Sequence, residues 1–376
     1  MKLKISLFRG FLEDGRLSME VYGNGLSRGL EENLGHRCEV HEYRPRPLLG
    51  TNILGMRLSR FIAYSWHARR HQGQINHIVD HGYGHLLHAI DPARTVVTVH
   101  DVIPLVRWRG GIPGVPPGRR PLLNLASFGA LRRAAHLISD SDNTRRDLIK
   151  MCGCQPSRIT VIHPGIDSIF RPYGLAEKRT AYRALNMPAY GFQRILIAGS
   201  EFYKNPIGAL RAFARLRKRH SRPLELIKLG VLSPEFTRVV EELDLSQSVR
   251  CLGTVPRSHL PAVYNCVDCL LFPSLYEGFG WPPLEAMACG TPVVASNAGS
   301  LPEVLGGACL MVNPRNEEAL SDAVYRVLTD PELRESLVAS GLTRAQRFTW
   351  QGTAAGVMRV YEQVLGVTRE SCRATR

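Results

Sequence analysis

Short apolar runs alternate with longer amphipathic stretches along most of the chain, a pattern typical of parallel strands joined by crossover helices. In the first half the candidate strands span Lys4–Phe8, Cys38–Tyr43, His77–Asp80, Thr95–His100, His136–Ser139 and Ile159–Ile162. In the second half they span Arg194–Ala198, Glu225–Leu229, Val249–Leu252, Cys269–Phe272, Pro292–Ala295 and Cys309–Val312. The pattern predicts an α/β fold with two Rossmann-like sheets, in which ligands bind beyond the carboxyl ends of the strands.

Prolines and glycines mark the division between the two halves. The stretch Phe170–Gly191 holds two of each around a short helix, which indicates a domain boundary. We therefore expect one domain at residues 1–175 and a second at residues 190–350. A last helix in residues 353–376 carries apolar residues at helical spacing and should pack on another element.

The segment Phe272–Val294 has the clearest chemistry. A buried strand ends at Pro273, a loop follows, and Pro282–Pro283 begin a helix that Gly290 ends. The backbone amides of Phe279, Gly280 and Trp281 fall where a helix dipole favours an anion.

Two carboxylates, Glu277 in the loop and Glu285 in the first helical turn, flank this anion site. Carboxylates beside an anion suit hydroxyl groups, so Glu285 is a candidate acceptor for a ribose diol and Glu277 for a sugar hydroxyl. The alternative is that Glu285 only complements the helix dipole.

The whole segment, SLYEGFGWPPLEAMACGTPVVASNAGSLPEV, resembles the nucleotide-sugar half of the family 4 retaining glycosyltransferases, which have two Rossmann-like domains facing across a cleft (the GT-B type). The resemblance extends in order through VHDVIP, ISDSDNTRRDLI, RITVIHPGID, ILIAGSEFYKN, VRCLGTVP and RFTWQGTAAGVMRVYEQVL. It implies that the last helix packs back on the first domain.

The resemblance also implies site residues. Glu277 would contact the transferred sugar, the amides of Phe279, Gly280 and Trp281 would hold sugar and phosphate, and Glu285 would hold the ribose. Lys204 and Ser200 would bind the diphosphate, where a cation offsets the charge on the leaving group. Val255 matches a position whose backbone contacts the base.

In the first domain, His100 matches the family's position near the anomeric carbon and the acceptor, where it would orient and stabilise rather than act as sole base. Asp101, which is also a candidate acceptor residue, would support that loop. Gly23 is a candidate for close approach to a phosphate, although the Gly-Gly pair of many relatives is absent. Tyr83 and His85 lie in the loop that lines the acceptor region of relatives.

We expect no metal and no cofactor beyond the nucleoside diphosphate sugar. The histidines of HIVDHGYGHLLH lack the spacing of a zinc site because Gly82 and Gly84 break the helix. Asp140, Ser141 and Asp142 precede a helix and are interpreted as capping residues.

The distribution of basic residues along the chain indicates which domain binds the acceptor. The chain carries 48 basic and 33 acidic residues, a net charge of +15, and residues 1–188 hold 27 of the basic and 15 of the acidic ones. The excess therefore lies in the first half, where Arg57, Arg60, Arg69 and Arg70 accompany Phe61 and Trp66. This composition suits peripheral docking on an anionic membrane.

The nine cysteines follow no framework spacing, and the N-terminus is typical of a strand rather than a secretion signal, so we expect a cytoplasmic protein on the inner membrane face. The favoured function is transfer of mannose or rhamnose from a GDP-sugar to a lipid-linked or growing glycan in polysaccharide or O-antigen synthesis. A UDP-sugar donor, a sugar-nucleotide epimerase, and a non-catalytic basic module binding lipid or nucleic acid are the alternatives. We expect no nucleic-acid partner.

Overall fold

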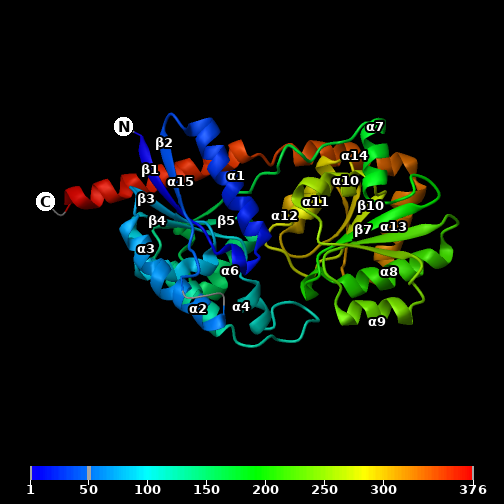
Figure 1. The fold of residues 1–376 in the computed structure, drawn as a ribbon, viewed down its shortest axis with the longest axis horizontal. Helices are drawn as coiled ribbons and strands as arrows, with labels where there is room; N and C mark the ends of the chain where they lie inside the picture. The colour runs from blue at the N-terminus through cyan, green and yellow to red at the C-terminus, as the bar shows by residue number, and fades with distance from the viewer. Residues whose placement is uncertain (1, 49–51, 375–376) are drawn as a thin grey trace. The chain divides into compact units, whose positions relative to one another are not determined.

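The computed structural model describes residues 2–48 and 52–374, which form two compact units (Figure 1). The first unit comprises Met1–Gly165 with Phe348–Arg376, and the second comprises Ile166–Arg347. Each unit is built on a six-stranded parallel sheet with helices on both faces, so the predicted fold class and all twelve predicted strands are confirmed.

The first sheet has the strand order β2-β1-β3-β4-β5-β6. Its central strands consist of buried, largely β-branched residues, as expected where helices cover both faces. The strands are β1 (Leu3–Phe8), β2 (Cys38–Tyr43), β3 (Ile75–Ile78), β4 (Thr95–Val99), β5 (His136–Ser139) and β6 (Ile159–Val161). Strand β3 ends two residues earlier than predicted because the Asp80 carboxylate turns back to accept a hydrogen bond from the Gly82 amide.

The main helices of the first unit are α1 (Leu17–Leu34), α2 (Ile53–Leu58), α3 (Tyr64–Arg70), α4 (Ile103–Trp108), α5 (Leu122–Ala130), α6 (Asp142–Cys152) and α15 (Trp350–Ala374). A single π-helical turn, η2 (Ser59–Ala63), joins α2 to α3.

Helix α15 packs against α1, and Figure 1 shows the two helices crossing. Two glycines of α1 make this close approach possible: a Cβ on Gly25 would lie 2.1 Å from the Trp350 ring, and one on Gly29 would lie 2.8 Å from the Trp350 carbonyl oxygen. A buried hydrogen bond of 2.6 Å between Tyr361 and His77 also ties α15 to β3.

The second sheet has the strand order β12-β11-β10-β7-β8-β9. Its strands are β7 (Gln193–Ala198), β8 (Leu224–Leu229), β9 (Val249–Gly253), β10 (Cys269–Phe272), β11 (Val293–Ser296) and β12 (Leu310–Val312). Helices α8 (Pro206–Arg219) and α13 (Glu317–Thr329) pack together, while α11 (Trp281–Ala288) packs against α10 (Leu260–Asn265) and α14 (Pro331–Ala345). The remaining helices are α7 (Leu175–Ala184), α9 (Pro234–Glu242) and α12 (Leu301–Leu305).

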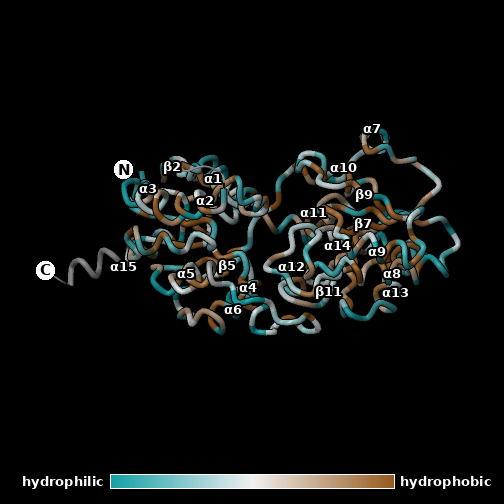
Figure 2. The backbone as a smooth tube through the Cα atoms, turned by 60° about the horizontal axis from the view of Figure 1, so that its bottom comes forward, coloured by the Kyte–Doolittle hydropathy of each residue, from teal (hydrophilic) through white to brown (hydrophobic). Residues whose placement is uncertain are grey.

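The core of this unit lies between the sheet and α8, α9 and α13, with Phe213, Leu226 and Leu271 among its buried residues. In Figure 2, hydrophobic residues, coloured brown, are concentrated around β7.

The boundary differs from the predicted one. The stretch Phe170–Gly191 belongs to the second unit, where the Tyr173 amide donates to Asn265 and the Arg194 guanidinium donates to the Pro188 carbonyl. The chain therefore leaves the first unit at Gly165, and it returns at Phe348. Prolines and glycines in this stretch mark a surface connection within the second unit rather than the point of crossing.

Strand order reverses between β1 and β3 in the first sheet and between β7 and β10 in the second. At such a switch point the loops beyond the carboxyl ends of two adjacent strands diverge and leave room for a ligand. Within residues 2–48 and 52–374, the structure contains no helix that is both long and apolar enough to cross a bilayer.

Candidate active site

The predicted site residues fall into two groups, one at the carboxyl edge of each sheet, and each group is described by itself. In the second unit, the loops that follow β7 and β10 are bridged by an ion pair. The Lys204 ammonium lies 2.7 Å and 3.0 Å from the two carboxylate oxygens of Glu277. Lys204 ends the short turn η7 (Phe202–Lys204), and Glu277 lies in the loop before α11. The structure thus brings together, at the switch point, the cation and the carboxylate that the sequence assigned to donor binding.

The loop that carries Glu277 is held from behind by α12 and the residues before it. The Ser300 hydroxyl donates to the Phe279 carbonyl at 2.8 Å, and the Ser300 amide donates to the Glu277 carbonyl. Gly280 has a φ of +104°, and a Cβ there would lie 2.6 Å from Leu301. The positive φ of Gly280, which favours glycine, and these hydrogen bonds together fix the turn that precedes α11 at Trp281.

Glu285 lies in the second turn of α11 rather than the first, because the helix begins at Trp281. Its carboxylate is buried, with Oε1 accepting from Arg257 at 2.8 Å and Oε2 from the Tyr264 hydroxyl at 3.0 Å. Burial raises the pKa of Glu285, and the Arg257 charge partly opposes that rise. Glu285 is therefore part of a polar network rather than a simple complement to the helix dipole, and each oxygen keeps a lone pair for a ligand hydroxyl.

Arg257 joins this network to the segment that enters the unit. Its Nε donates to Asp167 at 2.9 Å, and its guanidinium lies 5.0 Å from the centre of the Phe170 ring. Val255, predicted to contact a base, is half-buried two residues before Arg257, in the connection between β9 and η8 (Arg257–His259).

Ser200 lies in the loop after β7, and its hydroxyl donates to the Val231 carbonyl at 2.5 Å. The ammonium of Lys228, at the end of β8, approaches the same loop and donates to the Gly199 carbonyl at 2.7 Å. Lys228 was not among the predicted site residues.

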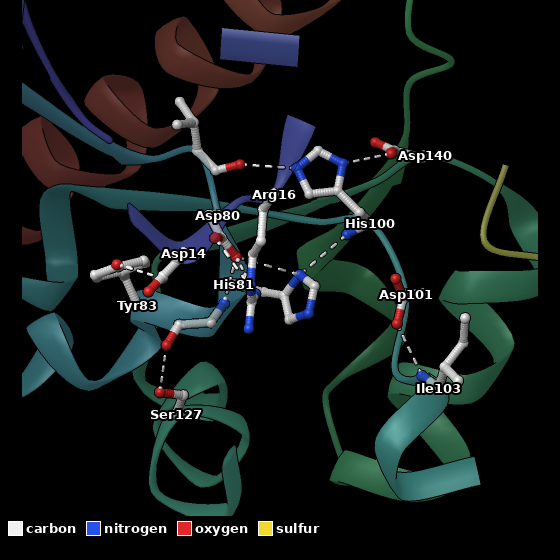
Figure 3. A network of polar contacts seen from close by, with 12 residues as sticks. Asp14, Arg16, Asp80, His81, Tyr83, His100, Asp101, Ile103, Ser127 and Asp140 are labelled. Atoms are coloured by element: carbon white, nitrogen blue, oxygen red, sulfur yellow. Dashed lines mark hydrogen bonds and ion pairs between the residues drawn. The ribbon is translucent and has the colours of Figure 1, made fainter. Parts of the chain in front are cut away.

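In the first unit, His100 follows β4 and is buried, with both ring nitrogens bonded (Figure 3). Nδ1 lies 2.6 Å from Asp140 Oδ2, and Nε2 lies 2.8 Å from the Val79 carbonyl oxygen. Burial alone would lower the pKa of His100, but the Asp140 carboxylate outweighs it and raises the pKa to about 9. Because both partners are acceptors, His100 carries two N–H groups and is a cation at neutral pH.

Arg16, Asp80 and His81 lie close together beyond β1 and β3, as Figure 3 shows. The Arg16 guanidinium is 3.3 Å from the buried Asp80 carboxylate, and His81 Nδ1 accepts a long hydrogen bond from the His100 amide. The Asp101 carboxylate accepts a hydrogen bond from the Ile103 amide at 2.9 Å, at the start of α4.

Tyr83 and His85 are interior residues of this loop and do not face solvent. The Tyr83 hydroxyl donates to Asp14 and accepts from the Phe11 amide, and His85 Nε2 donates to the Arg60 carbonyl. Burial lowers the pKa of His85 to about 4, so the ring is neutral. The arrangement makes both residues supports of the loop, and a direct contact with an acceptor would require it to open.

Arg60 belongs to the same supporting group. Its guanidinium pairs with Asp14, donates to the Gly82 carbonyl at 2.8 Å and lies 4.2 Å from the centre of the Tyr83 ring. It is therefore not a free surface cation, in contrast to the role predicted from the sequence.

Gly23 is a second correction. It lies inside α1 rather than in a loop, and a Cβ at this position would lie 2.3 Å from the Arg9 guanidinium carbon. The small residue makes room for Arg9, whose buried charge is paired with Glu20 and Glu42. Gly15, with a φ of +65° and open space around it, is the glycine that precedes α1.

Three functional neighbours were missed in the sequence: Asp140, Arg257 and Lys228. Asp140 was interpreted as a capping residue, but Ser141 provides the cap of α6 and leaves Asp140 to His100. A charged residue inside the apolar strand LELIKL was a usable signal for Lys228. The pairing of Arg257 with Glu285 left no signal in the local pattern.

Comparison with known proteins agrees with this geometry. Residues 16–169 match the family described as Glycosyltransferase Family 4, and residues 193–344 match the family described as Glycosyl transferases group 1. The chain is 30% identical to the O-antigen chain mannosyltransferase B of Escherichia coli, over 85% of this chain and 81% of that protein. It is 28% identical to a D-inositol 3-phosphate glycosyltransferase of Acidothermus cellulolyticus, over 79% of this chain but only 66% of that protein.

Solved structures share the fold. The sucrose-phosphate synthase of Thermosynechococcus elongatus superposes with a TM-score of 0.78 at 20% identity, covering 97% of this chain and 100% of that one. The HepE protein of Anabaena in complex with UDP and glucose gives a TM-score of 0.75 at 18% identity, with 96% and 100% coverage. WaaG, a glycosyltransferase involved in lipopolysaccharide biosynthesis, gives 0.68 at 16% identity, with 94% and 98% coverage.

Proposed function

Because the chain belongs to family 4 of the glycosyltransferases, we propose that it transfers a hexose, with retention, from a nucleoside diphosphate sugar to a lipid-linked or growing glycan. The observation that carries the proposal is the bridge between Lys204 and Glu277 across the switch point of the second sheet. A cation for the diphosphate and a carboxylate for sugar hydroxyls are the two groups that such a donor requires at one place.

GDP-mannose is the favoured donor. Two relatives support this choice, the O-antigen chain mannosyltransferase B and the serotype-specific mannosyltransferase WbdA, both of Escherichia coli. A rhamnose donor and UDP-sugars are the alternatives, and UDP is supported by the name of the HepE complex. The proposed acceptor is an O-antigen or exopolysaccharide intermediate.

In the proposed reaction the glycosyl bond to the diphosphate breaks and a bond to the acceptor hydroxyl forms on the same face of the sugar. The hydroxyl proton passes to the leaving phosphate oxygen, and Lys204 offsets the charge that develops there. Glu277 binds sugar hydroxyls and Glu285 the ribose, and the backbone of Val255 contacts the base. The backbone amides of Phe279, Gly280 and Trp281, together with Ser200, hold the phosphates. No metal takes part.

His100 has no free lone pair on either ring nitrogen, so it is not the base of this reaction. In the proposal it is a fixed positive charge that orients the site of the first unit, with Asp101 holding its loop. The first unit binds the acceptor.

The test is a panel of GDP-, UDP- and dTDP-sugars, scored first by thermal shift and then by transfer to a membrane extract. D-inositol 3-phosphate is included as a second acceptor because of the inositol relatives. We expect GDP-mannose to stabilise the protein and support transfer, and Glu285→Ala to raise the KM for donor more than it lowers kcat. A wild-type protein stabilised by no nucleotide would refute the proposal, and sugar interconversion with donor alone would identify an epimerase instead.

We further propose that the enzyme works in the cytoplasm and docks peripherally on an anionic leaflet through the helical segment α2–α3. Leu54, Ile62 and Trp66 are 66%, 64% and 57% exposed and recur every four or eight residues, about whole turns apart. Arg57, Arg69 and Arg70 are exposed beside them, and Arg70 stacks 3.5 Å over the Trp66 ring. Exposed apolar residues flanked by arginines suit the interface of a bilayer.

Reversing the charge at Arg57, Arg69 and Arg70 should abolish most binding to vesicles containing phosphatidylglycerol, since each cation contributes about 1 kcal/mol near such a surface. Cosedimentation is the measurement. The matched control reverses Lys218, Arg222 and Arg326, three exposed cations of the second unit, and should bind as the wild type does. Equal binding by both variants would exclude this docking segment.

A further inference from the structure

Lys228 is a buried lysine whose ammonium is hydrogen-bonded to backbone carbonyls. Its side chain lies at the carboxyl end of β8, and the residue is 1% exposed. The ammonium donates to the Gly199 carbonyl at 2.7 Å and to the Leu229 carbonyl, and lies 3.5 Å from the Ser200 hydroxyl. Among the residues that the structure describes, no carboxylate lies within 4.0 Å of this nitrogen.

An unpaired ammonium in the interior is costly, and its neighbours only partly compensate it. Burial lowers the pKa of Lys228, while the more distant Glu201 and Cys251 act in the opposite direction. Glu201 is exposed, and its carboxylate accepts a hydrogen bond from the Ser200 amide. A leucine or methionine would fill this strand position without the cost, so the charge requires a reason.

The position of the Lys228 ammonium suggests why a charge is present in this strand. It lies directly beneath the Gly199–Ser200 loop, which leads from β7 into the turn that carries Lys204. Two glycines with positive φ let the ends of β7 and β8 approach: Gly199 at +91° and Gly230 at +96°, where a Cβ would lie 2.7 Å from Ser200 Oγ. The two loops pack closely, and the Lys228 ammonium lies 2.7 Å from the Gly199 carbonyl oxygen and 3.5 Å from Ser200 Oγ.

The charge of Lys204 alone does not account for attraction of an anionic ligand to this loop. Lys204 forms its ion pair with Glu277 at 2.7 Å, so the two residues together present little net charge to an incoming anion. Lys228, at the end of β8, lies against this loop and has no carboxylate partner among the described residues. Its field acts through a low-dielectric layer of protein, where charges interact more strongly than in water.

We propose that Lys228 provides the positive charge that selects a diphosphate over less charged ligands in the donor site, acting through the Gly199–Ser200 loop. It is a positioning residue, because the loop lies between its ammonium and the ligand. The role rests on the proposed function, in which this loop receives the diphosphate of the donor.

The test compares ligands that differ only in phosphate count. Dissociation constants of guanosine, GMP and GDP, or of the uridine series if the panel selects UDP, are measured by calorimetry without divalent metal for wild type, Lys228→Met and Lys228→Arg. We expect Lys228→Met to weaken the diphosphate about tenfold, the monophosphate less, and the nucleoside not at all, since the lost Coulomb energy scales with ligand charge. Lys228→Arg should stay within about threefold of wild type for the diphosphate, because it keeps the charge.

A matched control is Lys218→Met, which removes an exposed charge from α8 and should leave all three constants unchanged. Should Lys228→Met fail to fold, Lys228→Gln tests the same loss of charge with a side chain that can still donate to the loop carbonyls. If the neutral variant binds all three ligands as wild type does, or weakens them equally, the proposed role is overturned. Wild-type protein that binds no nucleoside diphosphate overturns the proposed function itself.

Discussion

At the scale of single residues, the pair between His100 and Asp140 has the largest consequence. The contact of 2.6 Å is buried, and the groups that face the ring are the Tyr22 edge, His81, Asp80 and the Val79 carbonyl. The Asp140 carboxylate, the Val79 carbonyl and the Asp80 carboxylate all stabilise the charge of the imidazolium. The protonation of His100 is therefore a property of the folded state, and it links stability to pH.

We predict that this pair stabilises the protein below about pH 6.5 and that its contribution is lost as the pH rises through about 9. The sign follows because the folded-state pKa is raised above the ordinary value, so the folded state holds the proton more tightly. The loss is on the order of 3 kcal/mol. Urea unfolding at pH 6.5 and 9.5 measures it.

Asp140→Asn is the matched variant, because it keeps the size of the side chain and removes the charge. Its free energy of unfolding should depend much less on pH over this range than that of the wild type. Parallel pH profiles for the two proteins would contradict the prediction.

At this scale, some site residues could be predicted from the sequence and others could not. Lys204, Glu277 and Glu285 were found because a local motif carries them, and the structure places the first two in contact. Their partners were not found, because Arg257 meets Glu285 across 28 positions and Asp140 meets His100 across 40. Such contacts are created by the fold and leave no periodic trace in the sequence. Gly23 failed for a related reason, since its small size serves a distant arginine.

At the scale of elements, the strands were predictable because buried parallel strands are short, continuous apolar runs bounded by turn residues. Their ends were less so: β3 ends early because Asp80 turns to cap the following 3-10 turn. The extent of the last helix was underestimated at its start, where Trp350 begins α15. The family resemblance implied that this helix packs on the first domain. The small size of the glycines in α1 explains how α15 approaches α1 so closely.

We predict that Gly25→Ala destabilises the protein by about 1–3 kcal/mol, because the added methyl would lie 2.1 Å from the Trp350 ring and force the two helices apart. The control is Gly129→Ala in α5, where nothing lies within 4 Å of the added Cβ. That change should stabilise by up to about 1 kcal/mol, since alanine favours a helix. Thermal unfolding of both variants is the measurement, and a neutral Gly25→Ala would argue against tight packing of α15 on α1.

At the scale of the whole molecule, charge and chemistry are divided between the units. The basic excess lies in the first half of the sequence, whereas the proposed donor site, with Lys204 and Glu277, lies in the nearly balanced second unit. The composition alone did not separate a membrane-docking enzyme from a nucleic-acid-binding protein, because both favour exposed arginine. The structure reduces the set of arginines that could contact a partner surface. Arg60 is hydrogen-bonded within the first unit, whereas Arg57, Arg69 and Arg70 are exposed.

The discontinuous make-up of the first unit has a consequence for biosynthesis. Its helix α15 is encoded after the entire second unit, so α1 lacks this packing partner until the second unit has been synthesised. The second unit is one unbroken stretch and can finish its core as it leaves the ribosome. Of the two units, the one whose synthesis begins first is thus the last to complete its packing.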